Sequence, residues 1–132
     1  MKESLELSVK LPVTCENLYK AWLDSETHSE FTESIAEIDS SINGKFSAWE
    51  GYITGTNLVL EPYQKIVQAW RTTEFGDKDE DSKLELIFEK MNNETKLTLI
   101  HSNIPEDQSE EYKEGWLDFY FKPMKKYFGK KG

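Results

Sequence analysis

The sequence predicts an α+β fold in which a curved antiparallel sheet wraps around one long C-terminal helix. Several segments alternate apolar and polar residues, and turn residues separate them, as in a meander of strands. After Pro105 the apolar residues change to helical spacing. An antiparallel sheet has one apolar face to cover, and this helix carries the largest apolar stripe in the chain.

The chain begins with a strand, followed by one or two short helices. Residues 3–11 alternate strictly, which is typical of a half-buried strand. Pro12 ends this strand, and Thr14 is a suitable N-cap for a helix over Cys15 to Leu23. The polar segment 24–33 is either a second short helix or a turn.

Residues 34–75 are rich in β-branched and aromatic residues, and they predict further strands. Asn43-Gly44 is a strong hairpin signal. The segment that contains Gly51 and Gly55 is not a phosphate-binding loop, because such a loop needs a Lys-Ser/Thr pair and a helix after it, and neither is present. The strand-like surroundings of the two glycines are too short for a membrane helix, so we expect bends or bulges in a curved sheet. Residues 61–63 predict one more turn.

The last strands and the final helix follow an acidic segment. Residues 75–82 predict an exposed loop, and residues 82–90 and 95–103 predict two strands joined by a tight turn. The final helix carries an aromatic stripe in which we include Tyr112, Trp116, Phe119, Pro123 and Tyr127. We expect Pro123 to kink this helix, because proline removes a backbone hydrogen bond.

Composition limits the class of protein. We expect residues 1–132 to form one domain, and the net charge of -9 argues against nucleic acid as a partner. No apolar segment reaches the ~20 residues that span a bilayer, and the N-terminus has no signal-peptide core. The single cysteine, Cys15, fits a reducing compartment, so we expect a cytoplasmic protein.

The histidines and tryptophans are the residues from which a functional site could be built. We expect His28 to be solvated, because its neighbours are polar, and His101 to be a core histidine on the inner face of its strand. The separations of His28 and His101 from Cys15 along the sequence do not match those of known metal ligands, so we expect no metal and no cofactor. Three of the tryptophans are Trp49, Trp70 and Trp116. They suggest either ordinary core packing or the walls of a partly hollow interior, in which Gln68 or His101 would supply the polar contacts to a ligand.

No combination of nucleophile, base and oxyanion donor is visible, so we expect the protein not to be an enzyme. A cavity-based cyclase or hydrolase that depends on His101 is the least favoured interpretation.

One ordered set of residues resembles a known family. The set comprises Gly44, Phe46, Gly51, Ile53, Gly55, Leu58, Leu60, Pro62, Ile66, Val67, Gln68, Trp70 and Arg71. It is similar to the core signature of the Hsp90 ATPase activator homologue family, in its C-terminal-type domain, and residues 115–128 resemble the family's Gly-Trp ending. The family belongs to the START-like (SRPBCC) superfamily, whose helix-grip fold agrees with the predicted order of elements.

The resemblance implies a cavity and a partner. START-like proteins commonly hold an apolar cavity between the sheet and the C-terminal helix. The expected wall residues here are Gln68, Trp70, Phe88, Leu99, His101, Trp116, Phe119 and Tyr120. The family name implies binding to the Hsp90 chaperone, although we expect the N-terminal domain of the two-domain eukaryotic activator to be missing. The alternative is a protein that binds a small hydrophobic molecule, such as a lipid or polyketide, and has no chaperone role.

Overall fold

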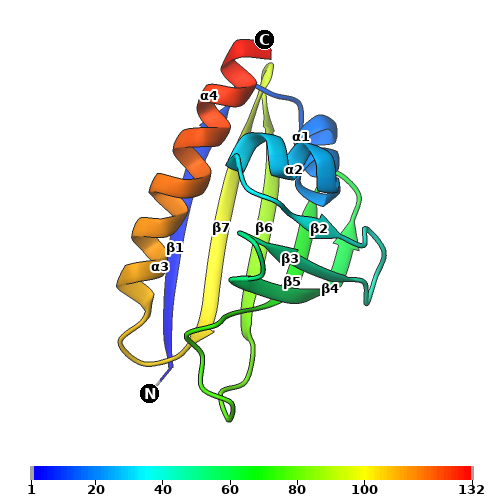
Figure 1. Cartoon of the computed structure of the whole chain (residues 1–132). Coiled ribbons are helices and arrows are strands. Elements are labelled where there is room, and N and C mark those ends of the chain that lie inside the picture. Colours follow the sequence, from blue (N-terminus) through cyan, green and yellow to red (C-terminus); the bar gives the residue numbers. More distant parts are fainter. Residues whose placement is uncertain (1, 132) are drawn as a thin grey trace.

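A seven-stranded antiparallel sheet wraps around the C-terminal helix in a computed structural model that describes residues 2–131 (Figure 1). The elements in chain order are β1 (Glu3–Leu11), α1 (Cys15–Leu23), α2 (Ser25–Thr32), β2 (Glu37–Ile38), β3 (Lys45–Ala48), β4 (Ile53–Glu61), β5 (Lys65–Thr72), β6 (Ser82–Met91), β7 (Glu94–Ile104), α3 (Ser109–Gly115), the π-helical segment η1 (Trp116–Phe121) and α4 (Lys122–Lys131). The strand order is β1-β7-β6-β5-β4-β3-β2, so the first strand pairs with the last. This arrangement confirms the predicted helix-grip fold.

The helices form one layer over the sheet. α1 packs against β6 and β7, whereas α2 packs against η1 and α4. Figure 1 shows α1 and α2 beside the upper part of the C-terminal helix. The buried apolar residues between these helices and the sheet belong to one hydrophobic core cluster. Burial of this shared apolar surface is the main force that holds the two layers together.

Local sequence signals explain the N-terminal elements. The predicted cap is present, because the Asn17 N–H donates to Thr14 Oγ1 over 3.1 Å. The segment 24–33 contains a second helix, in which the Thr27 N–H donates to Asp24 Oδ2 over 2.9 Å. Both side chains satisfy backbone donors that a helix start leaves unpaired.

Two glycines of the sheet have different roles. Gly51 lies in the β3–β4 turn with a φ of 90°, which confirms the predicted bend. Gly55 is not a bulge, because it pairs regularly with Phe46 and Trp70, and the irregular pairing of β4 lies between Asn57 and Val59. A Cβ on Gly55 would lie 2.0 Å from the carbonyl oxygen of Ala69 and 2.5 Å from the Phe46 ring. The close approach of the Ala69 carbonyl and the Phe46 ring therefore explains why position 55 is a glycine.

The C-terminal helix buries a different stripe from the predicted one. Every fourth residue is buried, namely Tyr112, Trp116, Tyr120, Met124 and Phe128. Phe119 is 58% exposed, so its predicted place on the inner face is wrong. The cause is η1, since a π-helical turn holds more residues than an α-helical turn and rotates the residues that follow. The helix continues through Pro123, and the irregular turn lies directly before it.

Substitution of Gly55 by alanine should destabilise the fold. The added methyl group would overlap the Ala69 carbonyl and the Phe46 ring, so we expect a loss of about 3 kcal/mol in the free energy of unfolding, measured with urea. Gly129→Ala is the matched control. Gly129 lies in α4 with no atom within 4 Å of the added Cβ, so this change should stabilise by about 0.5–1 kcal/mol. Equal stability of the two variants would contradict the close-approach account.

Candidate functional site

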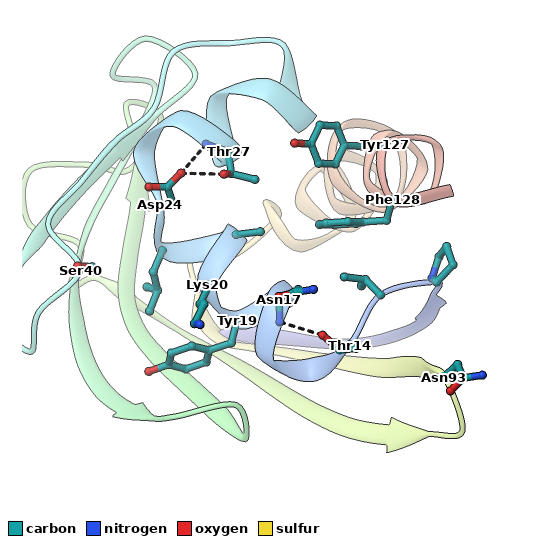
Figure 2. A pocket seen from close by; sticks show the side chains of 14 residues that line it. Thr14, Asn17, Tyr19, Lys20, Asp24, Thr27, Ser40, Asn93, Tyr127 and Phe128 are labelled. Carbon is teal, nitrogen blue, oxygen red and sulfur yellow. Dashed lines mark hydrogen bonds between the residues drawn. The ribbon is translucent and has the colours of Figure 1, made fainter. Parts of the chain in front are cut away.

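The first hollow has no set of side chains that converge on one point. It measures about 850 Å³ and lies around α1, next to the β6–β7 turn and the end of α4. Figure 2 shows its side chains spread on different sides of α1. Two of its polar groups, Thr14 Oγ1 and Asp24 Oδ2, already accept the capping hydrogen bonds of α1 and α2. These two polar groups therefore serve to cap the helices α1 and α2.

A second hollow is an aromatic pocket between the C-terminal helix and the strands β4 and β5. Its volume is about 400 Å³, within the usual range for small-molecule sites. The lining residues are Trp49, Tyr52, Ile53, Trp70, Glu111, Tyr112, Gly115, Trp116, Phe119 and Tyr120. Seven of these ten are aromatic, and a few polar groups stand among them, which is the usual composition of a binding site. We call this hollow the aromatic pocket.

One wall of the aromatic pocket is a strained turn. Trp49, Glu50 and Gly51 have positive φ angles of 55°, 57° and 90° in succession. A left-handed conformation costs roughly 1–2 kcal/mol for a residue with a side chain. The turn brings the Trp49 ring against Phe119, with 5.7 Å between ring centroids, and Glu50 N–H donates to the Ile35 carbonyl. Strain of this kind is often found where a side chain must be presented for function.

Behind the tryptophans of the aromatic pocket lies a chain of hydrogen bonds, which we call the relay. The Trp116 indole N–H donates to His101 Nδ1 over 3.1 Å. Because an indole can only donate, the proton of the neutral imidazole is on Nε2, which donates to Ser82 Oγ over 2.8 Å. Ser82 Oγ in turn donates to the Trp70 carbonyl over 2.7 Å. Burial lowers the pKa of His101 to about 3, so the ring is neutral.

The second histidine lies in the core and not in solvent. His28 is 4% exposed, so the expectation that it is solvated is wrong. Its Nδ1 donates to the Trp22 carbonyl over 2.9 Å, and its Nε2 accepts from the Tyr120 hydroxyl over 3.0 Å. Burial lowers the pKa of His28 to about 4 and raises the pKa of Tyr120. The ring therefore links α2 to the helix wall of the pocket.

Two further hydroxyls belong to tyrosines that line the aromatic pocket. The Tyr112 hydroxyl donates to Gln108 Oε1 over 2.6 Å and shares a 2.7 Å hydrogen bond with Thr72 Oγ1. Burial raises the pKa of Tyr112 to about 12. The Tyr52 hydroxyl donates to a carboxylate oxygen of Glu74. Both hydroxyl groups thus have partners on the protein and remain protonated at neutral pH.

The structure divides the eight predicted wall residues into two groups. Four of them line the aromatic pocket, namely Trp70, Trp116, Phe119 and Tyr120. The other four lie elsewhere in the core, namely Gln68, Phe88, Leu99 and His101. Whether the pocket residues bind a ligand stays a prediction.

The four residues outside the aromatic pocket pack within the protein. The Gln68 amide donates to Asn57 Oδ1 over 2.8 Å. The Phe88 ring contacts Tyr19 of α1, and Leu99 is fully buried on β7. His101 lies behind the tryptophans and takes part in the relay. The alternation of residues along a strand indicates which side chains share a face. It could not show how far along the strand the pocket lies.

Sequence reasoning left several wall residues out of the predicted set. Trp49 belongs to the three tryptophans named as possible walls, and Gly51, two positions later, is the available signal. Tyr52 and Ile53 belong to the turn and the start of β4, which the helix approaches only in the tertiary structure. Glu111 and Tyr112 come from the first turns of α3. Nothing in their local pattern indicates a pocket.

Within residues 2–131 no group of three or more His, Cys, Asp or Glu side chains is arranged to hold a metal ion. No helix in that part of the chain combines the length and apolar character needed to cross a bilayer. The free thiol of Cys15 accepts a hydrogen bond from the Thr95 hydroxyl over 3.4 Å, outside the aromatic pocket.

Comparison with known proteins connects this architecture to named relatives. A family described as "Activator of Hsp90 ATPase homolog 1-like protein" matches residues 12–129. The activator of 90 kDa heat shock protein ATPase homolog 1 from Homo sapiens is 30% identical over 114 residues, which are 86% of this chain and 33% of the human protein. This chain therefore spans about a third of the length of the curated relatives it matches first.

Solved structures share the fold over nearly the whole chain. An HSP90 activator from Plasmodium falciparum is 30% identical, covers 96% of both chains and superposes with a TM-score of 0.89. CalU16 from Micromonospora echinospora is 21% identical and covers 93% of this chain and 76% of its own, with a TM-score of 0.75. The second likeness concerns the fold alone.

Acidification should destabilise the protein through its two buried histidines. The pKa values of His28 and His101 lie at about 4 and about 3 in the folded state, against 6.5 for an exposed histidine. The unfolded chain therefore binds protons first, so stability is complete above pH 6.5 and falls below it. Each histidine should contribute a slope of about 1.4 kcal/mol per pH unit between about pH 6 and pH 4.5.

Urea denaturation at a series of pH values measures this slope. In a His28→Gln variant the slope should fall to about half, because one group that binds a proton on unfolding is gone. This comparison uses the change with pH and is independent of the variant's starting stability. A free energy of unfolding that stays constant from pH 6.5 to pH 4.5 would contradict the neutral buried state of both rings.

Proposed function

Because the chain belongs to the Activator of Hsp90 ATPase homolog 1-like family, we propose that it is a co-chaperone-like domain that binds Hsp90 and stimulates its ATPase. The observation that carries this proposal is the likeness to the Plasmodium falciparum HSP90 activator, which covers 96% of both chains. That protein is named an activator, and the solved chain that carries the name is about as long as this one. We also propose that residues 1–132 act as one START-like domain in the cytoplasm.

Charge supports a protein partner with a basic surface. The chain carries 25 acidic against 16 basic side chains, a net charge of -9. Complementary charge raises the rate of association and favours the correct partner. Surface electrostatics of this kind weaken with salt, since the Debye length falls to about 3 Å at 1 M ionic strength. Binding to Hsp90 should therefore be salt-sensitive.

The proposed role requires no chemistry from the domain itself. His101 was the residue on which a cavity-based enzyme would have depended. Its two ring nitrogens are bonded to Trp116 and Ser82, and burial keeps the ring neutral. A general base must reach a substrate proton, and this imidazole has no free nitrogen to do so. These contacts support a non-catalytic function.

Binding of a small hydrophobic molecule is the second candidate function. The observation in its favour is the aromatic pocket, whose volume of about 400 Å³ suits a compact apolar ligand. Under this alternative the Trp70→Ala variant would change the affinity for the ligand beyond the effect on stability. In a solid core the same change would mainly destabilise, by roughly 3–5 kcal/mol.

A titration of the ¹⁵N-labelled chain with Hsp90 from the same organism tests the proposed function. We expect a contiguous and saturable set of shifted amide signals, together with a higher rate of ATP hydrolysis by the chaperone. Both effects should weaken when the salt concentration rises from about 0.05 M to about 0.5 M, because exposed charges are then screened. A spectrum unchanged by excess Hsp90 would reject the chaperone role and leave the ligand-binding alternative.

A further inference from the structure

Two carboxylates meet at the rim of the aromatic pocket without a cation between them. Glu111 lines the pocket, and so does Tyr52, whose hydroxyl group reaches the carboxylate of Glu74. Loss of hydration, and then the neighbouring Glu74, raise the pKa of Glu111, as expected for two acidic groups that repel each other.

Among the residues that the structure describes, no basic side chain pairs with these two carboxylates. No lysine or arginine is among the residues that line the aromatic pocket. Arg71, which follows Trp70 in β5, is bound instead to Asp81 over 2.8 Å and lies 5.3 Å from the Phe75 ring centroid. A cation at this rim would have to come from another molecule.

The walls behind the carboxylates suit a planar cation. The side chains of Trp49, Tyr52, Trp70 and Trp116 all border the same space. The face of an aromatic ring attracts cations, most strongly when the ring is that of tryptophan. A guanidinium group stacks on such rings and forms paired hydrogen bonds with carboxylates, whereas an ammonium group forms a single compact contact. This combination of rings and acids favours arginine.

The surroundings of the pocket favour a protein as the source of that arginine. Phe119 is 58% exposed and Ile35 is 61% exposed. Both are connected to the strained turn, Phe119 through the Trp49 ring and Ile35 through its hydrogen bond with Glu50. A free small cation would leave these apolar side chains in water, whereas a protein surface would cover them. Arginine and aromatic anchors are typical of the centres of protein interfaces.

We infer that the aromatic pocket is an anchor site for an arginine side chain of the chaperone, which stacks on the tryptophans and pairs with Glu74 and Glu111. This inference rests on the proposed function and adds the contact surface and the chemistry of the residue it receives. Phe119 and Ile35 form the apolar rim of the contact. The net charge of -9 brings the basic partner surface to the pocket.

The first experiment tests the pocket without the chaperone. N-acetyl-arginine amide is titrated into the ¹⁵N-labelled protein, with N-acetyl-citrulline amide as the neutral probe of the same shape. The arginine probe should shift the indole signals of Trp49, Trp70 and Trp116, with a dissociation constant on the order of 1 mM, as expected for so small a ligand. Trp22 does not line the pocket and is the internal control.

Three results of this titration would overturn the inference. Equal shifts with the citrulline probe would show that the pocket only selects an apolar shape. Equal shifts with N-acetyl-lysine amide would show a preference for any cation. An absence of indole shifts at high concentrations of the arginine probe would show that the pocket does not receive the side chain at all.

The second experiment measures Hsp90 affinity in charge variants. Glu74→Gln and Glu111→Gln should each reduce the affinity about tenfold, since each removes a charge partner of the anchored arginine. Glu80→Gln, in the exposed acidic loop, removes the same charge away from the pocket and should change the affinity little. All three positions are exposed, so the variants should fold, which circular dichroism verifies.

The outcomes separate the inference from the proposed function. If the wild-type chain binds Hsp90 and all three variants bind equally well, the anchor site is rejected and the chaperone role stands. If the wild-type chain does not bind Hsp90 but the arginine probe shifts the three indoles, the chaperone role is rejected and the arginine site is retained. Loss of affinity in the two pocket variants alone supports both.

Discussion

The hydrogen bond from the Trp116 indole to His101 joins the C-terminal helix to strand β7 of the sheet. It is possible only because burial keeps the imidazole neutral, with Nδ1 free to accept. The relay continues through Ser82 to the backbone of β5. Each donor in this apolar interior has an acceptor, which matters because an unpaired buried polar group costs about 1–3 kcal/mol. This contact therefore fixes the Trp116 side chain within the apolar interface that holds the helix on the sheet.

The π-helical segment η1 determines which aromatic side chains face the core and which face solvent. With every fourth residue buried, Tyr120 points inward to His28 and Phe119 points outward to Trp49. A regular α-helix with the same sequence would divide these residues differently. One irregular turn thus supplies both a buried hydrogen-bond network and an exposed apolar rim. The strained turn at Trp49 completes the rim from the opposite side of the aromatic pocket.

The elements of the fold were predictable where a local signal was sufficient. Alternation identified β1, β6 and β7, because a strand with one buried face requires it. Thr14 identified the start of α1, because its side-chain oxygen can accept a hydrogen bond from a backbone N–H of the first turn. Gly55 was identified as special but for the wrong reason, because the Phe46 ring that excludes a Cβ comes from another strand. A short local pattern contains no information about such a neighbour.

The sequence by itself determined the general order of elements, from a first strand and short helices through further strands to the C-terminal helix, and it determined the family, because these depend on periodicity and on ordered motifs. Only the tertiary structure decided that His28 is buried, since its polar neighbours along the chain face away from the core that α2 and the helix enclose. It also decided that Glu111 borders the same pocket as Tyr52, whose hydroxyl group reaches the Glu74 carboxylate. Distances between elements arise from packing, and packing is a property of the whole chain.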